Sequence, residues 1–261
     1  MKIVNETLIG LKSYSKAIPF IFKNGLGWLF FVPILLNIVL LFFGFYSVGS
    51  LTEIVVSSDW LQKENWDFWG GDVLNETLYW IIWIGLKIIF FIIFAYVGGF
   101  VVLILMSPVL AYASELTEKK STQKEYPFNF IHLLKDVIRG VVIALRNLFI
   151  ELFWMVLMFF FTFIPIIGWT SPIIMFFISS YYYGFSFLDY NNERKRLSVK
   201  ESTQLIKQRK GISIGVGALF AVFLLIPIVG PMLSGFAAIV STVSGTLAYL
   251  EIDKNQTAVV Q

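Results

Sequence analysis

Hydrophobic residues along this chain fall into long runs, and polar residues are gathered in the connections between them. The runs at 26–48 and 78–111 are each longer than the roughly 20 apolar residues that a helix needs to cross a bilayer. We therefore expect a transmembrane helix in each of these two segments.

Two later apolar blocks, 148–188 and 212–250, differ because proline and glycine interrupt each of them near its middle. The letters at the break are FIPIIG in the first block and LIPIVG in the second. Proline ends a helix and glycine permits a tight turn, so each block is predicted to be a helical hairpin. In the second block, the spaced glycines of 211–217 also predict close contact with a neighbouring helix. The predicted tip residues are Pro165, Gly168, Pro227 and Gly230.

The N-terminal segment, 1–25, has a different pattern, in which apolar residues alternate with lysines. This pattern is typical of an amphipathic helix that lies in the headgroup plane of a membrane. A second amphipathic helix is predicted at 127–146, where Arg139 and Arg146 share one face because they are about two helical turns apart.

The composition is that of a protein whose solvent is a lipid bilayer. Of the 261 residues, 57% are hydrophobic and only 14% are charged, and the mean hydropathy is +0.78. A soluble domain has about 25% charged residues. The chain is therefore predicted to be an all-α integral membrane protein. Its single domain, 1–261, would combine two long transmembrane helices with two helical hairpins and amphipathic interfacial helices.

Basic residues are distributed unevenly along the chain. Four precede residue 26, one lies in the connection 49–76, six lie in 119–146 and seven in 194–210. Cytoplasmic segments of membrane proteins carry an excess of lysine and arginine. The N-terminus and the bases of both hairpins are therefore expected in the cytoplasm, and the acidic 49–76 connection is expected outside.

This sidedness leaves two geometries open for the hairpins. Their arms of about 16–20 residues would measure roughly 24–30 Å as helix, so they either cross the bilayer or stop part-way as re-entrant hairpins. A turn at mid-depth has to be buried in protein or face water, because lipid satisfies no backbone hydrogen bonds. Uncharged tips with proline and glycine favour the re-entrant form by a small margin.

The composition also excludes several classes of function. The formal charge of +3 is too small to indicate binding of nucleic acid, and the chain has no cysteine and one histidine. We therefore expect no disulfide, no metal site and no cofactor. No pair of carboxylates and no arrangement of serine with lysine or histidine predicts catalysis, so the protein is not expected to be an enzyme.

Several polar residues at apparent membrane depth are candidates for an ion pathway, each with a plainer alternative. Lys87 either lines a pathway or extends its ammonium group to the outer interface. Arg139 and Arg146 either attract an anion at the cytoplasmic mouth or contact acidic lipid headgroups. Glu151 either belongs to the pathway or forms a local hydrogen-bonded pair with Asn147, one turn earlier.

Four stretches of the chain carry the likeness to a known family. They are NGLGWLFFVPILLNIVLL at 24–41, MSPVLAYASELTEK at 106–119, FLDYNNERKRLSVKESTQLIKQRKGISIGVGA at 187–218, and the IPI[I/V]G sequence at both hairpin tips. In this order and spacing they resemble the CysZ family of bacterial sulfate permeases, which shares a superfamily with the etoposide-induced membrane proteins.

The resemblance implies two long spanning helices and two hairpins that penetrate the bilayer only in part. It also implies a homo-oligomer in the bacterial cytoplasmic (inner) membrane, surrounded by lipids, in which the hairpins line or support a central pathway. The implied substrate is sulfate or a related small anion, which would move passively without ATP hydrolysis.

Anion binding in this family is associated with a Gly-Leu-Arg segment before the first long helix, which resembles the segment Asn24, Gly25, Leu26 and Gly27. Free N–H groups at a helix start and glycines that permit close approach would suit an anion. Where the family carries two arginines, this chain has Gly27 and Trp28. The site then lacks charge-assisted hydrogen bonds, which are roughly twice as strong as neutral ones. The plainer alternative is a helix N-cap with flexible glycines.

These observations lead to two main hypotheses of function. The first is a CysZ-like permease or channel that moves sulfate or a related oxyanion. The second, which the missing arginines favour, is a non-transporting structural or assembly protein that kept the fold and docks a membrane-protein partner. A third hypothesis, a lipid-organising protein, rests only on the basic amphipathic helices.

Overall fold

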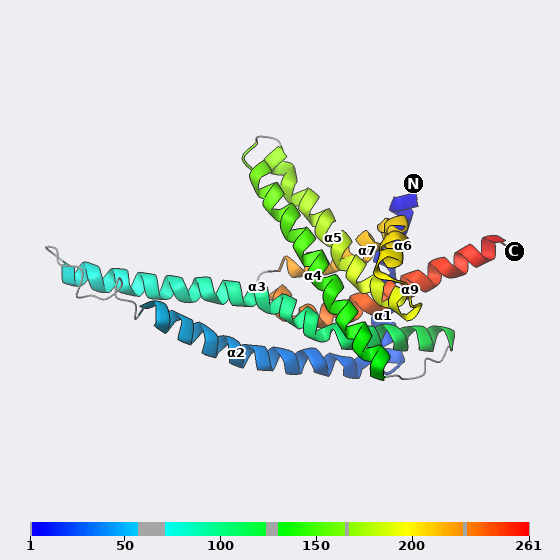
Figure 1. Cartoon of the computed structure of the whole chain (residues 1–261), viewed down its shortest axis with the longest axis horizontal. Helices are drawn as coiled ribbons and strands as arrows, with labels where there is room; N and C mark the ends of the chain where they lie inside the picture. The colour runs from blue at the N-terminus through cyan, green and yellow to red at the C-terminus, as the bar shows by residue number, and fades with distance from the viewer. Residues whose placement is uncertain (1, 57–70, 124–129, 165–166, 227–228, 261) are drawn as a thin grey trace.

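The structure, a computed structural model, describes residues 2–56, 71–123, 130–164, 167–226 and 229–260. All regular structure in these ranges is helical, which confirms the predicted all-α class of membrane protein. The elements, shown in Figure 1, are α1 (Lys2–Lys23), the 3-10 helix η1 (Gly27–Phe30), α2 (Phe31–Val56), α3 (Gly71–Thr122), α4 (Phe130–Phe161), α5 (Ile167–Arg194), α6 (Val199–Gln208), α7 (Lys210–Leu224), α8 (Val229–Met232) and α9 (Ser234–Val260).

Helices α2 and α3 pack along each other and form an arm that projects from the rest of the protein (Figure 1). α3 has 52 residues, which corresponds to about 78 Å of helix. The predicted spans 26–48 and 78–111 fall within η1–α2 and α3. Many of their side chains lie outside the described residues, so their crossing of the bilayer stays a prediction.

Two segments of the described chain are long and apolar enough to cross a membrane, namely Ile138–Phe161 in α4 and Ser234–Lys254 in α9. Both contribute an arm to a predicted hairpin. Most of the first segment is exposed, whereas most of the second is buried within the protein. Length and hydropathy therefore do not decide whether these arms cross the bilayer or stop part-way.

Helix α1 bends sharply away from the helix that follows it. Its axis makes an angle of 101° with the Gly27–Val39 stretch. One face of α1 is buried against α7 and α9, while apolar side chains such as Val4 and Phe22 are exposed on the other. A helix that is nearly perpendicular to α2 and presents exposed apolar residues and lysines suits the predicted position in the headgroup plane.

Helix α7 is packed on several sides, by α1, α5 and α9. Its glycines allow backbones to approach more closely than side chains would permit. A β-carbon at Gly215 would collide with the Thr7 carbonyl oxygen of α1, and one at Gly217 would collide with the Ser180 carbonyl oxygen of α5. The close helix packing predicted for the glycines of 211–217 is therefore confirmed.

The two hairpin tips share a backbone arrangement. At each tip the glycine N–H, of Gly168 or Gly230, donates to the carbonyl group four residues earlier, at 2.8 Å. A β-carbon on either glycine would come into conflict with the carbonyl oxygen at the end of the preceding arm. Both tips thus need glycine to close. The predicted tip prolines, Pro165 and Pro227, lie outside the described residues.

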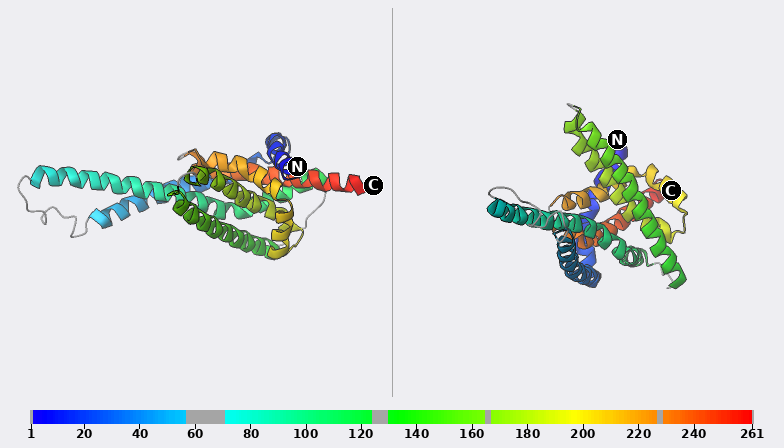
Figure 2. Two further views of the ribbon diagram at one scale, coloured as in Figure 1. Left: turned by 90° about the horizontal axis from the view of Figure 1, so that it is seen from above. Right: turned by 60° about the vertical axis from the view of Figure 1, so that its left-hand side comes forward.

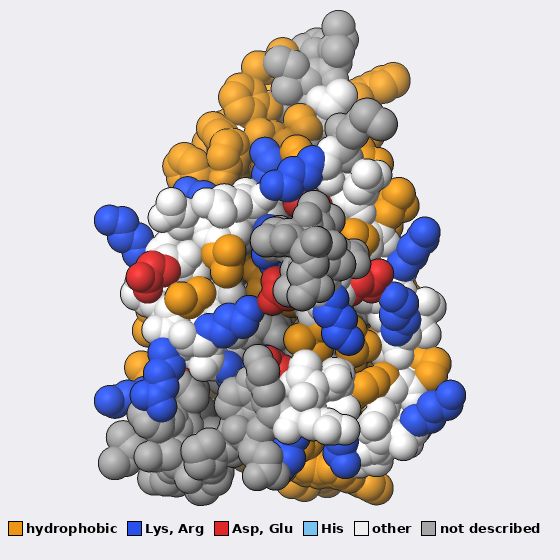
Figure 3. All heavy atoms as spheres, turned by 90° about the vertical axis from the view of Figure 1, so that its right-hand side faces the viewer, with side chains coloured by type: hydrophobic (Ala, Val, Ile, Leu, Met, Phe, Trp, Pro, Cys, Tyr) orange, Lys and Arg blue, Asp and Glu red, His pale blue; other side chains and the backbone are white. Residues whose placement is uncertain are grey.

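The molecule has two chemically different ends. The α2–α3 arm and the two hairpin tips lie toward the same side in both the first view and the view from above (Figures 1 and 2). Lys and Arg side chains are spread over the opposite end, near α6, the start of α1 and the end of α9 (Figure 3). The hairpins therefore have basic surroundings at their bases and apolar tips.

We predict that Gly217→Ala lowers the stability of the protein in detergent by about 1–3 kcal/mol, the usual cost of an overpacked core. The new methyl group would be forced against the Ser180 carbonyl oxygen and would lie 2.6 Å from the Gly184 nitrogen. The thermal midpoint of unfolding, followed by loss of the monodisperse peak in size exclusion, is the measurement.

Gly85→Ala is the matched control, because nothing lies within 4 Å of a β-carbon at Gly85. Alanine is the better helix former by up to about 1 kcal/mol, so this variant should be as stable as the parent or slightly more stable. Equal midpoints for both variants would contradict the close approach of α7 to α5.

Candidate functional site

The turn that contains Asn24, Gly25, Leu26 and Gly27 ends α1. The Leu26 N–H donates to the Ile21 carbonyl at 2.8 Å, and Gly25 has a φ of +71°, in the left-handed region. These features form a Schellman cap at a helix C-terminus. The Asn24 amide adds to it by donating to the carbonyl group of the preceding turn at 2.9 Å.

The predicted N-cap at this turn is therefore wrong, because these residues close the helix before them. Leu26 precedes η1 and gives it no side-chain cap. The cap of α1 also consumes the N–H groups of Gly25 and Leu26. Within the described hydrogen bonds, the N–H groups of Gly27 and Trp28 have no acceptor, so fewer donors remain for an anion than the sequence predicts.

Trp28, at a position where the resemblance stated above implies an arginine, packs against an aromatic side chain of α3. Its ring centroid lies 6.0 Å from that of Tyr112 at an interplanar angle of 58°. About half of Trp28 is exposed. The pair anchors the start of η1 to the arm, and it adds no positive charge to the turn.

Glu151, a predicted pathway residue, and Asn147, its expected local partner, bind α5 and not each other. The Asn147 amide donates to the Ser186 hydroxyl at 3.0 Å, and the Ser179 hydroxyl donates to the Glu151 carboxylate at 2.5 Å. No hydrogen bond between Asn147 and Glu151 is present among the described contacts. The local pair expected as the plainer alternative is thus replaced by two links that hold α4 against α5.

A cavity of about 60 Å³ lies beside these links, between α3, α4 and α5. Its walls are mostly apolar, and the polar residues that line it include Asn147, Glu151, Ser186 and Asp189, together with three tyrosines. The cavity is large enough for a few water molecules, which need about 10–15 Å³ each. No cluster of acidic residues or histidine suited to a metal ion occurs in the described part of the chain, so the cavity offers room for polar groups but no metal site.

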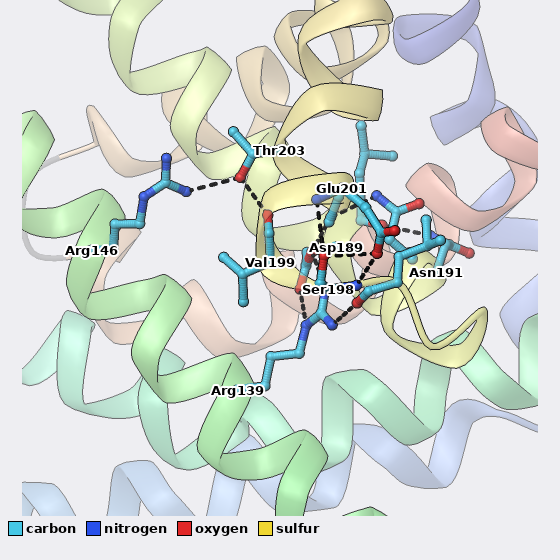
Figure 4. A network of polar contacts seen from close by, with 12 residues as sticks. Arg139, Arg146, Asp189, Asn191, Ser198, Val199, Glu201 and Thr203 are labelled. Atoms are coloured by element: carbon cyan, nitrogen blue, oxygen red, sulfur yellow. Dashed lines mark hydrogen bonds and ion pairs between the residues drawn. The ribbon is translucent and has the colours of Figure 1, made fainter.

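Arg139 forms a buried ion pair that ties α4 to α5 (Figure 4). Its Nε and Nη2 atoms donate to the two oxygens of Asp189 at 3.1 and 3.0 Å. Its Nη1 atom donates to the Leu197 carbonyl, and Ser202 donates its hydroxyl proton to Asp189. The charge of the Arg139 guanidinium is thus already paired with Asp189, which argues against the predicted pathway role of Arg139.

A second buried pair joins α3 to the end of α5. Arg194 donates to the Glu118 carboxylate at 2.7 and 2.9 Å, to the Ser114 hydroxyl at 2.6 Å and to the Asn191 side chain at 2.8 Å. This role was not predicted from the sequence, because the run ERKR at 193–196 is most simply interpreted as a lipid-facing segment that sets the membrane topology. Only the nearby polar run of 189–193 marks α5 as having a polar end.

Helix α6 follows this network and begins with a capping box. The Ser198 hydroxyl accepts from the Glu201 N–H, and the Glu201 carboxylate accepts from the Ser198 N–H at 2.7 Å. Hydrogen bonds from the Ser198 hydroxyl and N–H lower the pKa of Glu201 below its ordinary value. The box fixes the start of α6, which carries Thr203 close to α4 (Figure 4).

Lys87 and Arg146, the remaining predicted cations, both lie over aromatic rings. The Lys87 ammonium is 3.5 Å from the centre of the Trp83 ring, one turn earlier on α3. The Arg146 guanidinium is 5.6 Å from the centre of the Phe185 ring of α5. The structure does not bring these two cations to the turn at Gly27, so the sequence-predicted candidates do not form one site within this chain.

We predict that Asp189→Leu destabilises the protein by about 3–5 kcal/mol, because it leaves Arg139 buried without its partner. The double variant Arg139→Met with Asp189→Leu should recover much of this loss, since it buries no unpaired charge. Urea denaturation in mild detergent, followed by tryptophan fluorescence, provides the comparison.

Lys195→Gln serves as the control, because its ion pair with Asp253 is roughly half exposed. Exposed pairs contribute about 0–1 kcal/mol. If Asp189→Leu were no less stable than Lys195→Gln, the buried pair would not be what fixes α4 on α5.

The chain is similar to known proteins along most of its length. Residues 13–233 match the family described as Sulfate transporter CysZ/Etoposide-induced protein 2.4. A protein of Vibrio parahaemolyticus serotype O3:K6 (strain RIMD 2210633) named Sulfate transporter CysZ is 25% identical over 230 residues, which cover 87% of this chain and 90% of the relative. Since the family match extends over well more than half of the 261 residues, the chain belongs to the family of sulfate transporter CysZ and etoposide-induced protein 2.4.

Proposed function

We propose that this membrane protein is a passive permease or channel for sulfate or a related oxyanion. The observation that carries the proposal is the match to the CysZ family over residues 13–233, together with a relative named as a sulfate transporter. The described residues add a small, mostly apolar cavity with a few polar side chains beside the first hairpin, and basic side chains at one end. We further infer a homo-oligomer in the bacterial inner membrane, as the resemblance to the CysZ family implies.

The proposed topology takes α3 as a full crossing of the bilayer. Trp83 and Lys87 lie near its outer end, and Tyr112 packs against Trp28 near its inner end. From Trp83 to Tyr112 the helix rises about 44 Å, which equals the roughly 40–45 Å of a bilayer with its headgroups. Aromatic residues at both levels fit the interfacial belts of membrane proteins. This arrangement favours the plainer alternative for Lys87, at the outer interface.

The hairpins are proposed to enter from the cytoplasmic side and to stop part-way. α7 has 15 residues, or about 22 Å of helix, whereas the hydrocarbon core is about 30 Å thick. In the first hairpin, the part of α4 from Asn147 to its end at Phe161 is about 21 Å long. Among the described residues of each tip, a glycine N–H closes the turn on the carbonyl group four residues earlier. A tip of this kind tolerates lipid better than an open loop.

The alternative, a structural or assembly protein, has one observation in its favour. Trp28 packs on Tyr112 where the family carries an arginine, and the N–H groups of Gly25 and Leu26 are consumed by the cap of α1. Such a protein would hold a membrane-protein partner and move no anion. A stoichiometric partner in mild-detergent purification, with no anion flux, would support this alternative.

We predict that the purified protein in liposomes takes up radiolabelled sulfate, and that Gly27→Arg lowers the KM for sulfate about tenfold. A β-carbon at Gly27 meets only the Phe22 ring, at 3.8 Å, so the position admits a side chain. A hydrogen bond to a charged group contributes about 1.5–3 kcal/mol, which corresponds to a factor of about 10 or more.

Gly27→Gln is the control for size without charge, and its KM should stay near that of the parent. Uptake no greater than in empty liposomes, with the folded oligomer verified by size exclusion, would refute the transport proposal. Equal KM values for Gly27→Arg and Gly27→Gln would show that the turn at 24–27 is not part of the anion pathway. They would not contradict the transport proposal itself.

We predict that a cysteine at position 169 resists membrane-impermeant maleimide from either side of intact vesicles. Trp169 is 89% exposed on the surface of the chain, so the chain itself does not shield Trp169→Cys and the proposed protection comes from lipid. The natural chain has no cysteine, and labelling is therefore free of background. Detergent should restore labelling.

Lys200→Cys on α6 is the companion variant, which should react only in inside-out vesicles. Reaction of Trp169→Cys in right-side-out vesicles would show that the first hairpin crosses the bilayer and would exclude the re-entrant geometry for it. Reaction of Lys200→Cys from the outside would reverse the proposed orientation.

A further inference from the structure

Arg146 differs from the other arginines whose partners are described. Arg139, Arg194 and Arg209 each pair with a carboxylate at 2.7–3.0 Å. Arg146 has no carboxylate partner in the described part of the chain. Its one hydrogen bond runs from Nη1 to the Thr203 hydroxyl at 3.4 Å, near the outer limit of such a bond.

The side chain of Arg146 is nevertheless held in a defined place between three helices (Figure 4). It extends from α4, its guanidinium lies over the Phe185 ring of α5, and it reaches Thr203 of α6. Thr203 donates its own proton to the Val199 carbonyl at 2.7 Å, so it acts only as an acceptor toward Arg146. A guanidinium has five N–H donors, and four of them remain available here.

The two carboxylates of α4 and α6 whose side chains the structure describes have partners of their own. Glu201 of α6 accepts from both the hydroxyl and the N–H of Ser198. Glu151 of α4 accepts from Ser179. On α6, Lys200 and Lys207 are exposed and add positive charge. The charge of Arg146 is therefore left for a ligand from outside the chain.

We propose that Arg146 is the cationic centre of an oxyanion site between α4 and α6, at the base of the first hairpin. A tetrahedral oxyanion fits, since the planar guanidinium donates two parallel hydrogen bonds to such groups. The ligand is sulfate or phosphate, either free or as the phosphate of an anionic lipid headgroup. The link of this site to transport rests on the proposed function, in which Arg146 supplies the charge that Gly27 and Trp28 do not.

Arg139 shows why the assignment is specific to one of the two arginines on this face of α4. It lies two turns earlier, yet its donors are taken by Asp189 and the Leu197 carbonyl. Arg139 and Arg146 carry the same charge, but binding an oxyanion also requires N–H donors that are not already used. The free donors make Arg146 the ligand-binding member and Arg139 the structural one.

Equilibrium binding of radiolabelled sulfate to the purified oligomer in detergent tests the site. Arg146→Gln should weaken binding about 10- to 100-fold, the equivalent of about one charge-assisted hydrogen bond. Arg146→Lys keeps the positive charge but loses the two parallel N–H donors of the guanidinium, so its affinity for sulfate should lie between those of the parent and of Arg146→Gln. Lys207→Gln removes one exposed charge from α6 and should leave binding nearly unchanged. Size exclusion verifies that each variant folds.

Native mass spectrometry with phosphatidylglycerol and with phosphatidylcholine distinguishes a free oxyanion from the phosphate of an anionic lipid headgroup as the ligand of Arg146. Loss of retained phosphatidylglycerol in Arg146→Gln, with sulfate binding weak in the parent, assigns the site to lipid. Loss of sulfate binding assigns it to the free anion. If Arg146→Gln binds sulfate and phosphatidylglycerol as the parent does, or if the parent binds neither, the proposal is overturned.

Sulfate uptake by the same variants separates this proposal from the proposed function. Binding that depends on Arg146 without any uptake by the parent would refute transport and keep the site. Uptake that is unchanged in Arg146→Gln, with binding lost, would keep transport and place the site off the pathway.

Discussion

The close approach of α7 to its neighbours is the constraint on which the rest of the fold depends. Glycines at 215 and 217 bring the backbones of α1 and α5 against α7, where any side chain would collide. α1 and α5 in turn carry the start of the arm and one side of the first hairpin. Because lipid gives helices no hydrophobic reason to associate, packing of this kind is the main force available within the bilayer.

Buried ion pairs then fix the hairpin at its base. Arg139 with Asp189 joins α4 to α5, and Arg194 with Glu118 joins α5 to α3. Each pair carries further hydrogen bonds from neighbouring side chains, which offset the cost of removing charges from water. The exposed parts of the hairpins have the opposite character, with aromatic and aliphatic side chains such as Phe163 and Leu225 on the surface.

The sequence predicted the class of fold, the helical blocks and the close packing of α7, because apolar runs and spaced glycines are local signals. It did not predict the cap at Gly25, since glycine occurs at helix starts as well as at helix ends, and the φ angle and the bond to Ile21 decide between them. The partners of Arg139 and Arg194 could not be predicted from the sequence either. Those pairs join residues 50 and 76 positions apart, and periodicity carries no information about such distances.

The continuity of α3 has a mechanical consequence. One helix runs from Gly71 to Thr122 and accommodates Pro108 without ending. It therefore carries Trp83 and Glu118 on the same rod, and Glu118 holds Arg194 at the end of α5. If α3 crosses the bilayer as proposed, a thinner or thicker bilayer that changes the tilt of this helix also displaces its inner end. The proposed topology thereby couples the thickness of the surrounding lipid to the position of the hairpin base.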